Sequence, residues 1–396
     1  MSKVRNRVII SSLMAILMAS QPVMSFAEVL NKPVSAEIET KGVHNAVQSK
    51  IEEVAQKYGA SGVEVAIIKN GQVADTFSYG WSTKGVDPMT TDTKIRIASI
   101  SKVILGMETM RLREKGVVNL DTSIGEYWGF PISNPNYPQK VISIRSLLSH
   151  TSSIDANLGK AKEYEVVSPL LQNGQAFDTS VPNHRHSWSY NNYAFDVLGL
   201  TIEQAANKSV DEMLREDFYT GMDIDGAFFT NNLKNTDNIA TLYNQKGDVE
   251  RSVEEQKAII GGFGPKGTGE HFAGGMEISV SDLAKLVALL ANDGMYDGKQ
   301  YLSPQSVAML EATNIGTVGD GFYQALPLRY RPNMYGRDRL YYHTGSAYGV
   351  YNTMSYDPGT KDGVVVLSIG AEGKKDDYGV YRICGEISEY IYNFVL

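Results

Sequence analysis

The chain has 396 residues, of which 42% are hydrophobic and 21% are charged, and its formal net charge at pH 7 is −8. A chain of this length can bury a sizeable core without disulfide bonds, and its single cysteine, Cys384, excludes an intrachain disulfide. The acidic balance disfavours nucleic acids and anionic lipids as partners, because both carry negative charge.

The N-terminus has the pattern of a secretory signal peptide. Residues 1–7 carry three basic side chains and no acid, an apolar run follows in residues 8–20, and Ser25 and Ala27 are small residues at the spacing of a cleavage site. The apolar run is shorter than the ~20 residues that a membrane span requires. We predict that the signal peptide, residues 1–27, is cut after Ala27 and that the protein is periplasmic or secreted, without a stable membrane span. An uncleaved segment would anchor it to the membrane instead.

Regular elements follow in the first part of the mature chain. Residues 29–45 are polar and predicted to be loosely held, and a helical pattern covers residues 44–59. Two predicted strands then flank Asn70 and Gly71, a dipeptide typical of two-residue hairpin turns. The next predicted helix begins near Ser99.

The middle and the end of the chain differ in character. Short helical patterns dominate residues 118–270, where strand signals are scarce. A helix with Ser279 at its start is predicted over residues 279–293. Three strands are predicted between residues 339 and 370, and a last helix over residues 378–395.

The order of these elements predicts an α/β (α+β) fold. Strands from both ends of the chain would form one antiparallel sheet flanked by helices, and the middle would form a mostly helical second lobe. We assign residues 28–117 and 271–396 to a discontinuous sheet domain, and residues 118–270 to a helical domain. A cleft between the two is the expected place of the active site.

A serine and a lysine stand three residues apart at the start of a predicted helix. Ser99 and Lys102 would share one face of this helix, whereas the side chains of Ser101 and Lys102 would diverge by about 100°. The helix N-terminus stabilises a developing alkoxide and offers free N–H groups to an oxyanion. Lys102, kept neutral by burial or by other positive charge, can accept the hydroxyl proton. Alternatively, Ser99 only caps the helix and Lys102 is solvated, as in most chance occurrences of such a short motif.

Two further motifs bear on this choice. Ser99 is the only serine of the chain with lysine at the third position after it. Tyr190 to Asn192 is the only Tyr-x-Asn, and His343 to Gly345 is the only His/Lys-Thr-Gly. In this order the three motifs resemble the serine penicillin-recognising enzymes, the β-lactamase/transpeptidase-like superfamily of penicillin-binding proteins, DD-peptidases and class C-like β-lactamases. The resemblance extends to the flanking segments and covers nearly all of the mature chain.

The resemblance implies a role for each residue of the first two motifs. Ser99 would be the acylated nucleophile, and Lys102 its proton acceptor or relay. Tyr190 would be the general base for the attacking water and the general acid for the leaving group, because neighbouring cations lower the pKa of a phenol. Asn192 would hydrogen-bond the substrate amide. A packing tyrosine and a turn asparagine are the alternatives for Tyr190 and Asn192.

The third motif is expected to line the cleft as the end of a strand. Gly345 would let a substrate backbone approach closely, and Thr344 would bind a carboxylate. The backbone N–H of Ser346, with that of Ser99, would complete an oxyanion hole. His343 stands where many relatives have lysine, and because histidine loses its charge near pH 7, carboxylate binding there is expected to weaken as the pH rises.

Two segments depart from the pattern of the superfamily. Residues 150–154 read His-Thr-Ser-Ser-Ile, where many relatives have Ser-Gly after His-Thr. The last predicted strand continues into Ser-Ile-Gly-Ala-Glu-Gly, where relatives often have an asparagine. An amide that helps to bind a substrate carboxylate is therefore expected to be absent.

Together these observations predict an exported serine acyl hydrolase that works through an acyl-enzyme on Ser99. A DD-peptidase or other D-amino-acid-specific peptide hydrolase of the penicillin-binding type is favoured, because His-Thr-Gly is commoner there than in class C β-lactamases. A class C-like β-lactamase or an esterase is the alternative within this chemistry. A penicillin-binding-like wall-binding or sensor module with little turnover is the alternative of another class.

The expected partner is a small substrate. It would be a peptide, a β-lactam or an ester, with cell-wall stem peptide as one source. The mechanism requires neither a metal nor a cofactor, and His184 and His186 form a His-x-His pair without an acid or cysteine grouped around it. The sequence leaves the oligomeric state open.

Overall fold

The computed structural model describes residues 34–161, 165–260, 263–268, 271–313 and 315–396. The predicted signal peptide lies outside the described residues. The chain divides into two compact units, residues 1–45 and residues 46–396. Helix α2 (Val34–Tyr58) begins in the first unit, so the helix starts well before residue 44, where the sequence pattern places it.

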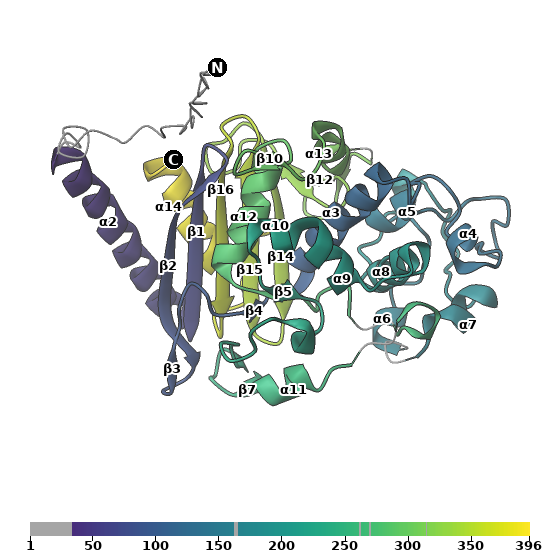
Figure 1. Ribbon diagram of the computed structural model, residues 1–396, viewed down its shortest axis with the longest axis horizontal. Helices are drawn as coiled ribbons and strands as arrows, with labels where there is room; N and C mark the ends of the chain where they lie inside the picture. Colours follow the sequence, from purple (N-terminus) through teal and green to yellow (C-terminus); the bar gives the residue numbers. More distant parts are fainter. Residues whose placement is uncertain (1–33, 162–164, 261–262, 269–270, 314) are drawn as a thin grey trace, which may run out of the picture. The chain divides into compact units, whose positions relative to one another are not determined.

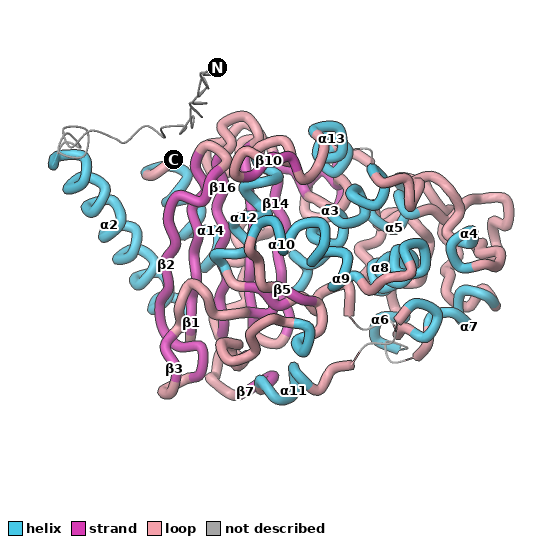
Figure 2. The backbone as a smooth tube through the Cα atoms, in the orientation of Figure 1, coloured by secondary structure: helices cyan, strands magenta, loops and turns pink. Residues whose placement is uncertain are grey.

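A nine-stranded antiparallel sheet forms the framework of the second unit (Figures 1 and 2). Its strands are β1 (Gly62–Lys69), β2 (Gln72–Thr83), β3 (Asp87–Pro88), β11 (Thr317–Val318), β12 (Phe322–Gln324), β13 (Arg329–Arg331), β14 (Leu340–Ala347), β15 (Val350–Asp357) and β16 (Asp362–Ile369). Their order in the sheet is β11-β12-β13-β14-β15-β16-β1-β2-β3. Because β1 pairs with β16, strands from the two ends of the chain join in one sheet, as predicted.

The described part of this unit also contains smaller sheets and twelve further α-helices. Three short sheets are formed by β4 (Ile95–Arg96), β8 (Glu277–Ile278) and β5 (Gly226–Ala227), by β6 (Leu242–Tyr243) and β7 (Val249–Arg251), and by β9 (Met295–Tyr296) and β10 (Lys299–Gln300). The helices are α3 (Ser101–Glu114), α4 (Gly125–Trp128), α5 (Ile144–Leu148), α6 (Leu158–Ala161), α7 (Val167–Gln172), α8 (Tyr193–Ala206), α9 (Val210–Leu214), α10 (Thr220–Met222), α11 (Val253–Lys257), α12 (Val280–Ala291), α13 (Pro304–Glu311) and α14 (Arg382–Phe394). Helices from the middle of the chain, α4 to α9, gather beside the sheet (Figure 1).

Strand β1 shows how the sheet builds two cores. Val63, Val65 and Ile67 belong to the hydrophobic cluster that includes α14, whereas Ala66 and Ile68 belong to the cluster that includes α12 and α3. Successive side chains of a strand point to opposite faces, so one apolar strand serves both layers. This is why β1 is buried almost without interruption.

Local signals in the sequence are confirmed at two places. Asn70 and Gly71 form the turn between β1 and β2, and both have positive φ values, 52° and 74°. Ser279 caps α12, because its side chain accepts a hydrogen bond of 3.2 Å from the backbone N–H of Asp282.

Three short strands and the proposed domain division show where the sequence prediction stops. Strands β11, β12 and β13 were not predicted, because segments of two or three residues show no period. Residues 46–396 form one compact unit, and the division into a sheet domain and a helical domain stays a prediction. None of the helices among the described residues is both long and apolar enough to cross a bilayer.

Candidate active site

Ser99 lies in a single 3₁₀ turn, Ala98–Ile100, that leads directly into α3. Ala98 has a φ of 49°, in the left-handed region, which costs a residue with a Cβ about 1 kcal/mol or more. The turn places Ser99 just ahead of the helix, where the first backbone N–H groups have no partner within the helix. Ser99 therefore lies at the helix N-terminus, as the sequence predicts.

Lys102 is completely buried and contacts Ser99 directly. Its ammonium donates hydrogen bonds to the Ala273 carbonyl oxygen at 2.5 Å, to Asn192 Oδ1 at 2.9 Å and to Ser99 Oγ at 3.2 Å. These three acceptors match the three donors of a lysine, and none of them is a carboxylate. The burial excludes the alternative in which Lys102 is a solvated surface residue.

The neighbouring serine has a different place. Ser101 is completely buried, and its Oγ accepts a hydrogen bond of 3.2 Å from the backbone N–H of Met276. This contact ties α3 to the segment before β8. Of the two serines, only Ser99 faces the ammonium of Lys102.

Tyr190 lies between two cations. Its ring centre is 5.1 Å from Lys102 Nζ and 5.3 Å from the guanidinium carbon of Arg329. Burial works to raise the pKa of Tyr190, but the positive charges of Lys102 and Arg329 outweigh it and hold this pKa below its usual value. A hydrogen bond with Ser99 acts in the same direction. The phenol is therefore more easily ionised than an ordinary tyrosine.

Arg329, on β13, is a residue of the site that the sequence analysis missed. Its guanidinium lies over the rings of Phe322, at 4.6 Å, and Tyr190, and donates a hydrogen bond of 3.3 Å to Thr344 Oγ1. The two rings hold the charge in place beside Thr344. No motif surrounds Arg329, and only the pairing of β13 with β14 brings it to the site.

The two asparagines of the second motif do different things. Asn191 is buried, donates to the Ile154 carbonyl at 2.6 Å and accepts from the Ala194 N–H at 3.0 Å, so it fixes the start of α8. Asn192 directs its Oδ1 to Lys102 instead. The turn role considered for Asn192 thus belongs to Asn191.

His343 is neutral at physiological pH. It is buried, and its Nδ1 lies 2.7 Å from the Thr344 carbonyl oxygen. Burial, together with the positive charges of Arg329 and Lys102, holds the pKa of His343 well below its usual value. A histidine that is already neutral cannot weaken carboxylate binding by losing its charge near pH 7, so this expectation is wrong for His343. The cation beside Thr344 is Arg329 instead.

Gly345 and Ser346 follow on the same strand. A Cβ on Gly345 would lie only 2.2 Å from the Ile97 carbonyl oxygen, so glycine is required here for β14 to pack against the segment before Ser99. The packing against Ile97 therefore explains the glycine at position 345 without the expected approach of a substrate. Ser346 is exposed and lines the same pocket as Ser99 and Asn192.

This pocket has a volume of about 190 Å³. It is lined by Arg96, Ala98, Ser99, Gly159, Asn192, Asp196, Ala273, Gly274, Ser346, Ala347 and Tyr348. Among the described residues that line it, Asp196 carries the one carboxyl group, which is buried and accepts a hydrogen bond of 3.0 Å from the Ala273 N–H. Burial raises the pKa of Asp196 to about 8, so this carboxyl is largely protonated at pH 7.

Residues 150–154, whose sequence differs from the pattern of the superfamily, still have a backbone conformation that glycine favours. Ser153 has a φ of 59°, in the left-handed region. Its Oγ accepts a hydrogen bond of 3.0 Å from Asn134 Nδ2. A serine therefore occupies the position where many relatives have glycine, and this hydrogen bond offsets part of its backbone strain.

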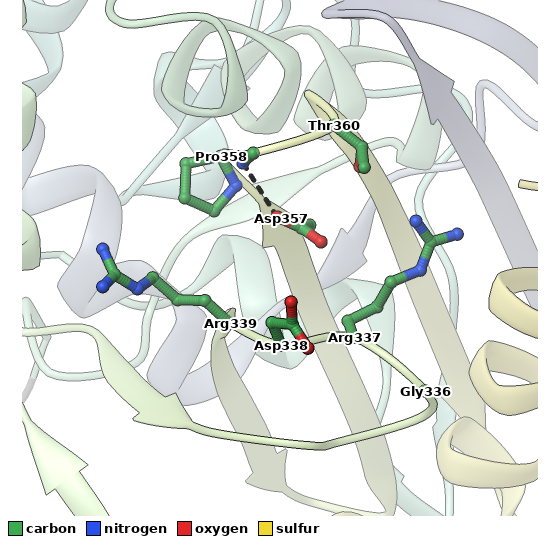
Figure 3. Close-up of a pocket in the computed structure, with 8 residues that line it drawn as sticks. Gly336, Arg337, Asp338, Arg339, Asp357, Pro358 and Thr360 are labelled. Carbon is green, nitrogen blue, oxygen red and sulfur yellow. Dashed lines mark hydrogen bonds between the residues drawn. The ribbon is translucent and has the colours of Figure 1, made fainter.

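A second hollow, of about 560 Å³, lies between residues 336–339 and 357–360 (Figure 3). Figure 3 shows its two arginine side chains extending to opposite sides, with two aspartates near its centre. Arg337 is 3.5 Å from the carboxylate of Asp362, and Asp357 accepts a backbone hydrogen bond of 2.8 Å. Arg337 and Asp357 thus have partners within the fold. No group of three or more His, Cys, Asp or Glu side chains that could hold a metal ion occurs among the described residues.

The antiparallel sheet, the helices that cover it and the buried Ser99–Lys102 pair define the β-lactamase/transpeptidase-like class. Residues 47–383 match the sequence model of the Beta-lactamase family, and the chain belongs to this family. Its members are serine hydrolases, among them β-lactamases and D-alanine carboxypeptidases.

Curated relatives match over part of their length. Protein flp of Staphylococcus aureus is 27% identical over 177 residues, which are 43% of this chain and 35% of flp. Penicillin-binding protein 4* of Bacillus subtilis is 23% identical over 186 residues, 44% of this chain and 39% of that protein. The match thus spans well under half of the length of these relatives.

Solved structures match over nearly the whole chain. The β-lactamase/D-alanine carboxypeptidase of Pseudomonas syringae is 19% identical with a TM-score of 0.69, covering 90% of this chain and 99% of that one. The octameric penicillin-binding protein homologue of Pyrococcus abyssi is 22% identical with a TM-score of 0.68, covering 87% and 76%. The D-amino acid amidase of Ochrobactrum anthropi is 19% identical with a TM-score of 0.67, covering 89% and 99%. At these identities the likeness establishes the fold.

Proposed function

We propose that this protein is an exported serine acyl hydrolase that forms an acyl-enzyme on Ser99. The observation that carries the proposal is the buried ammonium of Lys102, which contacts Ser99 Oγ and two neutral oxygens. Within the described part of the chain no carboxylate accepts a hydrogen bond from this ammonium, and burying a charge in this way is costly, so such a lysine requires a reason other than stability. Proton transfer from the serine hydroxyl is that reason.

The proposed reaction has two stages. The Oγ of Ser99 attacks the substrate carbonyl, and its proton passes to an unprotonated amine of Lys102 or, with Lys102 as an ammonium, is relayed to an ionised Tyr190 as Lys102 takes up one proton and gives up another. The backbone N–H groups of Ser99 and Ser346 hold the oxyanion. Tyr190 returns the proton to the leaving nitrogen or oxygen, the bond to the leaving group breaks, and an ester on Ser99 remains. Tyr190 then takes a proton from water as the water oxygen attacks the ester, and this proton passes to Ser99 Oγ as the bond between Oγ and the acyl carbon breaks and the acid product leaves.

The preferred substrate is a peptide that ends in a D-amino acid with a free carboxylate. Arg329 and the hydroxyl of Thr344 form a cationic, hydrogen-bonding site beside Tyr190, on the side proposed for the leaving group. A guanidinium is suited to binding a carboxylate. The D configuration follows from the motif resemblance, and structural neighbours named for D-alanine and D-amino acid substrates are in line with it.

A fluorescent penicillin tests the proposal. The parent protein is expected to give a label that persists on a denaturing gel, and Ser99→Ala is expected to abolish it. Ser101→Ala is the matched control, because this serine lies two residues away and faces Met276; it is expected to keep the label. Release of D-alanine from D-terminated but not from L-terminated peptides would then establish the peptidase.

The other candidate functions give different results in the same assay. Rapid loss of the drug without a lasting label would assign a β-lactamase, and hydrolysis of short-chain esters without label would assign an esterase. Neither adduct nor turnover on any of these substrates would overturn the proposal in favour of a wall-binding or sensor module. N-terminal sequencing of the exported protein tests the cut after Ala27.

A further inference from the structure

The buried carboxyl of Asp196 reaches the Ser99–Lys102 pair through the backbone of one residue. Its Oδ1 accepts a hydrogen bond of 3.0 Å from the N–H of Ala273. The carbonyl oxygen of Ala273 accepts the hydrogen bond of 2.5 Å from Lys102 Nζ, which in turn contacts Ser99 Oγ at 3.2 Å. A shift of the backbone at Ala273 would therefore displace an acceptor of the ammonium.

Helix α8 supplies a second contact to the same ammonium. Asn192 and Asp196 are four residues apart, and the N–H of Asp196 donates to the Asn192 carbonyl oxygen at 3.2 Å, so the two side chains lie on one face of the helix. Asn192 Oδ1 accepts from Lys102 directly at 2.9 Å, whereas Asp196 acts through Ala273. Two of the three acceptors of Lys102 thus depend on one turn of α8.

The charge of this carboxyl changes just above physiological pH. Burial raises the pKa of Asp196 to about 8, although the backbone N–H groups of residues 271–273 and the positive charge of Lys102 act to lower it. A protonated carboxyl keeps lone pairs that can accept a hydrogen bond, so below this pH Asp196 can hold Ala273 without a negative charge. Once ionised, it attracts the ammonium of Lys102.

Other titratable or charged groups surround Asp196. Those among the described residues are Lys102 on α3, Tyr193 on α8 with Glu165 acting on it, His271 before β8, and Arg96 and Tyr348, which line the same pocket. Burial lowers the pKa of His271 to about 3 and raises that of Tyr193, and an arginine keeps its charge. A comparison of aspartate with asparagine at position 196 cancels what these other groups contribute.

Resting on the proposed acyl-enzyme function, we propose that Asp196 is a positioning residue for Lys102, that it acts through the backbone of Ala273, and that the loss of its proton slows the acylation of Ser99. The direction is the same for both proton routes. A carboxylate near Lys102 makes the lysine hold its proton more tightly, which disfavours the unprotonated amine as acceptor and also disfavours the release of a proton in the relay. A merely structural carboxyl would change stability, but not the pH dependence of acylation.

The rate constant of acylation tests the positioning role. The parent and its variants are mixed with increasing concentrations of a penicillin, and the adduct is followed by intact mass. At a pH of about 6.5, Asp196→Ala is expected to lower the maximal rate constant by about 10–100-fold, with little change in the half-saturating concentration, because Lys102 is misplaced. Asp196→Asn is expected to stay within about threefold of the parent, because an amide oxygen can accept from the Ala273 N–H.

The pH dependence tests the role of the proton. As the pH rises from about 6.5 to about 9.5, Asp196 ionises in the parent, whereas an asparagine does not. The ratio of the Asp196→Asn rate constant to that of the parent is expected to rise by about three- to tenfold, which corresponds to a Lys102 pKa raised by about half a unit to one unit in the parent alone.

Asp211 provides the matched controls, Asp211→Asn and Asp211→Ala. It is also buried and accepts hydrogen bonds from the backbone N–H groups of Phe228 and Phe229 at 2.7 and 3.2 Å, and these partners do not line the pocket beside Ser99. Both variants are expected to keep the rate constant and the pH dependence of the parent. The rate constant does not depend on the amount of folded protein, and should Asp196→Ala fail to fold, the ratio for Asp196→Asn decides.

Four outcomes would overturn the proposal. They are an Asp196→Ala variant within about threefold of the parent, an effect confined to the half-saturating concentration, an Asp196→Asn variant as slow as the alanine variant, and a ratio that stays constant with pH. Each would leave the acyl-enzyme standing, because the adduct on Ser99 still forms. The absence of an adduct on Ser99 in the parent would refute the acyl-enzyme and the role of Asp196 together.

Discussion

Replacing Lys102 by methionine separates the catalytic from the structural role of its buried ammonium. Methionine has a similar length and no charge or donor, so the variant removes the contacts to Ser99 Oγ, Asn192 Oδ1 and the Ala273 carbonyl at once. Loss of a positioned proton acceptor slows a reaction by about 10²–10⁴-fold, which corresponds to about 3–5 kcal/mol in the barrier. We expect acylation of Ser99 to fall by this factor.

The effect of the same change on stability is expected to be small. Each buried acceptor that loses its donor costs about 1–3 kcal/mol, but removing a buried ammonium recovers a desolvation penalty of several kcal/mol. The two contributions oppose each other, so we expect the free energy of unfolding to change by no more than about 2 kcal/mol and Tm by no more than about 5 °C.

The assay is the rate of adduct formation, followed by intact mass after mixing with a penicillin or an activated ester, with Tm measured in parallel. Lys208→Met is the control, because this lysine is exposed and pairs with Glu216 at 2.6 Å on the surface. A Lys102→Met variant that acylates within about tenfold of the parent would refute the assignment of Lys102 as proton acceptor or relay. A variant that is inactive and has lost its folded state would assign the lysine a structural role instead.

Three further changes have expected outcomes of their own. Arg329→Gln should reduce the preference for a peptide with a free terminal carboxylate over its amide by about 10–100-fold, measured as a kcat/KM ratio. Arg331→Gln is the control and should keep that preference, because the guanidinium of Arg331 contacts the carbonyls of residues 320 and 321. Asp196→Asn should gain stability relative to the parent as the pH rises from about 4 to about 8. The raised pKa of Asp196 means that its protonated form favours the folded parent, and the parent loses this stability as the pH rises through the folded pKa of about 8. The asparagine variant has no such group to titrate. Urea unfolding at several pH values measures the difference, and a constant difference contradicts the reasoning. Ser279→Ala should cost about 1 kcal/mol through loss of the cap of α12, whereas Ser279→Thr, which keeps a hydroxyl, should cost less; an unchanged urea midpoint in the alanine variant would show that the cap contributes nothing.

Local features of this protein can be predicted from its sequence. The turn at Asn70 and Gly71 depends on two neighbouring residues that tolerate positive φ, and the cap at Ser279 depends on an N–H three residues away. The contact between Ser99 and Lys102 is of the same kind, because residues three apart at a helix start meet on one face. The order of strands and helices along the chain likewise sufficed to predict one antiparallel sheet.

The surroundings of that contact were decided by tertiary structure alone. The Ala273 carbonyl reaches Lys102 across 171 residues of chain, and Arg329 reaches Thr344 only because a three-residue strand, β13, pairs with β14. Burial likewise determines that His343 is neutral, and it does so through residues from other segments. Helix starts and turns depend on backbone geometry within a few residues, whereas the charge state of a side chain depends on every group packed around it. The sequence therefore determined which residues are candidates for the chemistry, and the packing of distant segments decided which charges stand beside them.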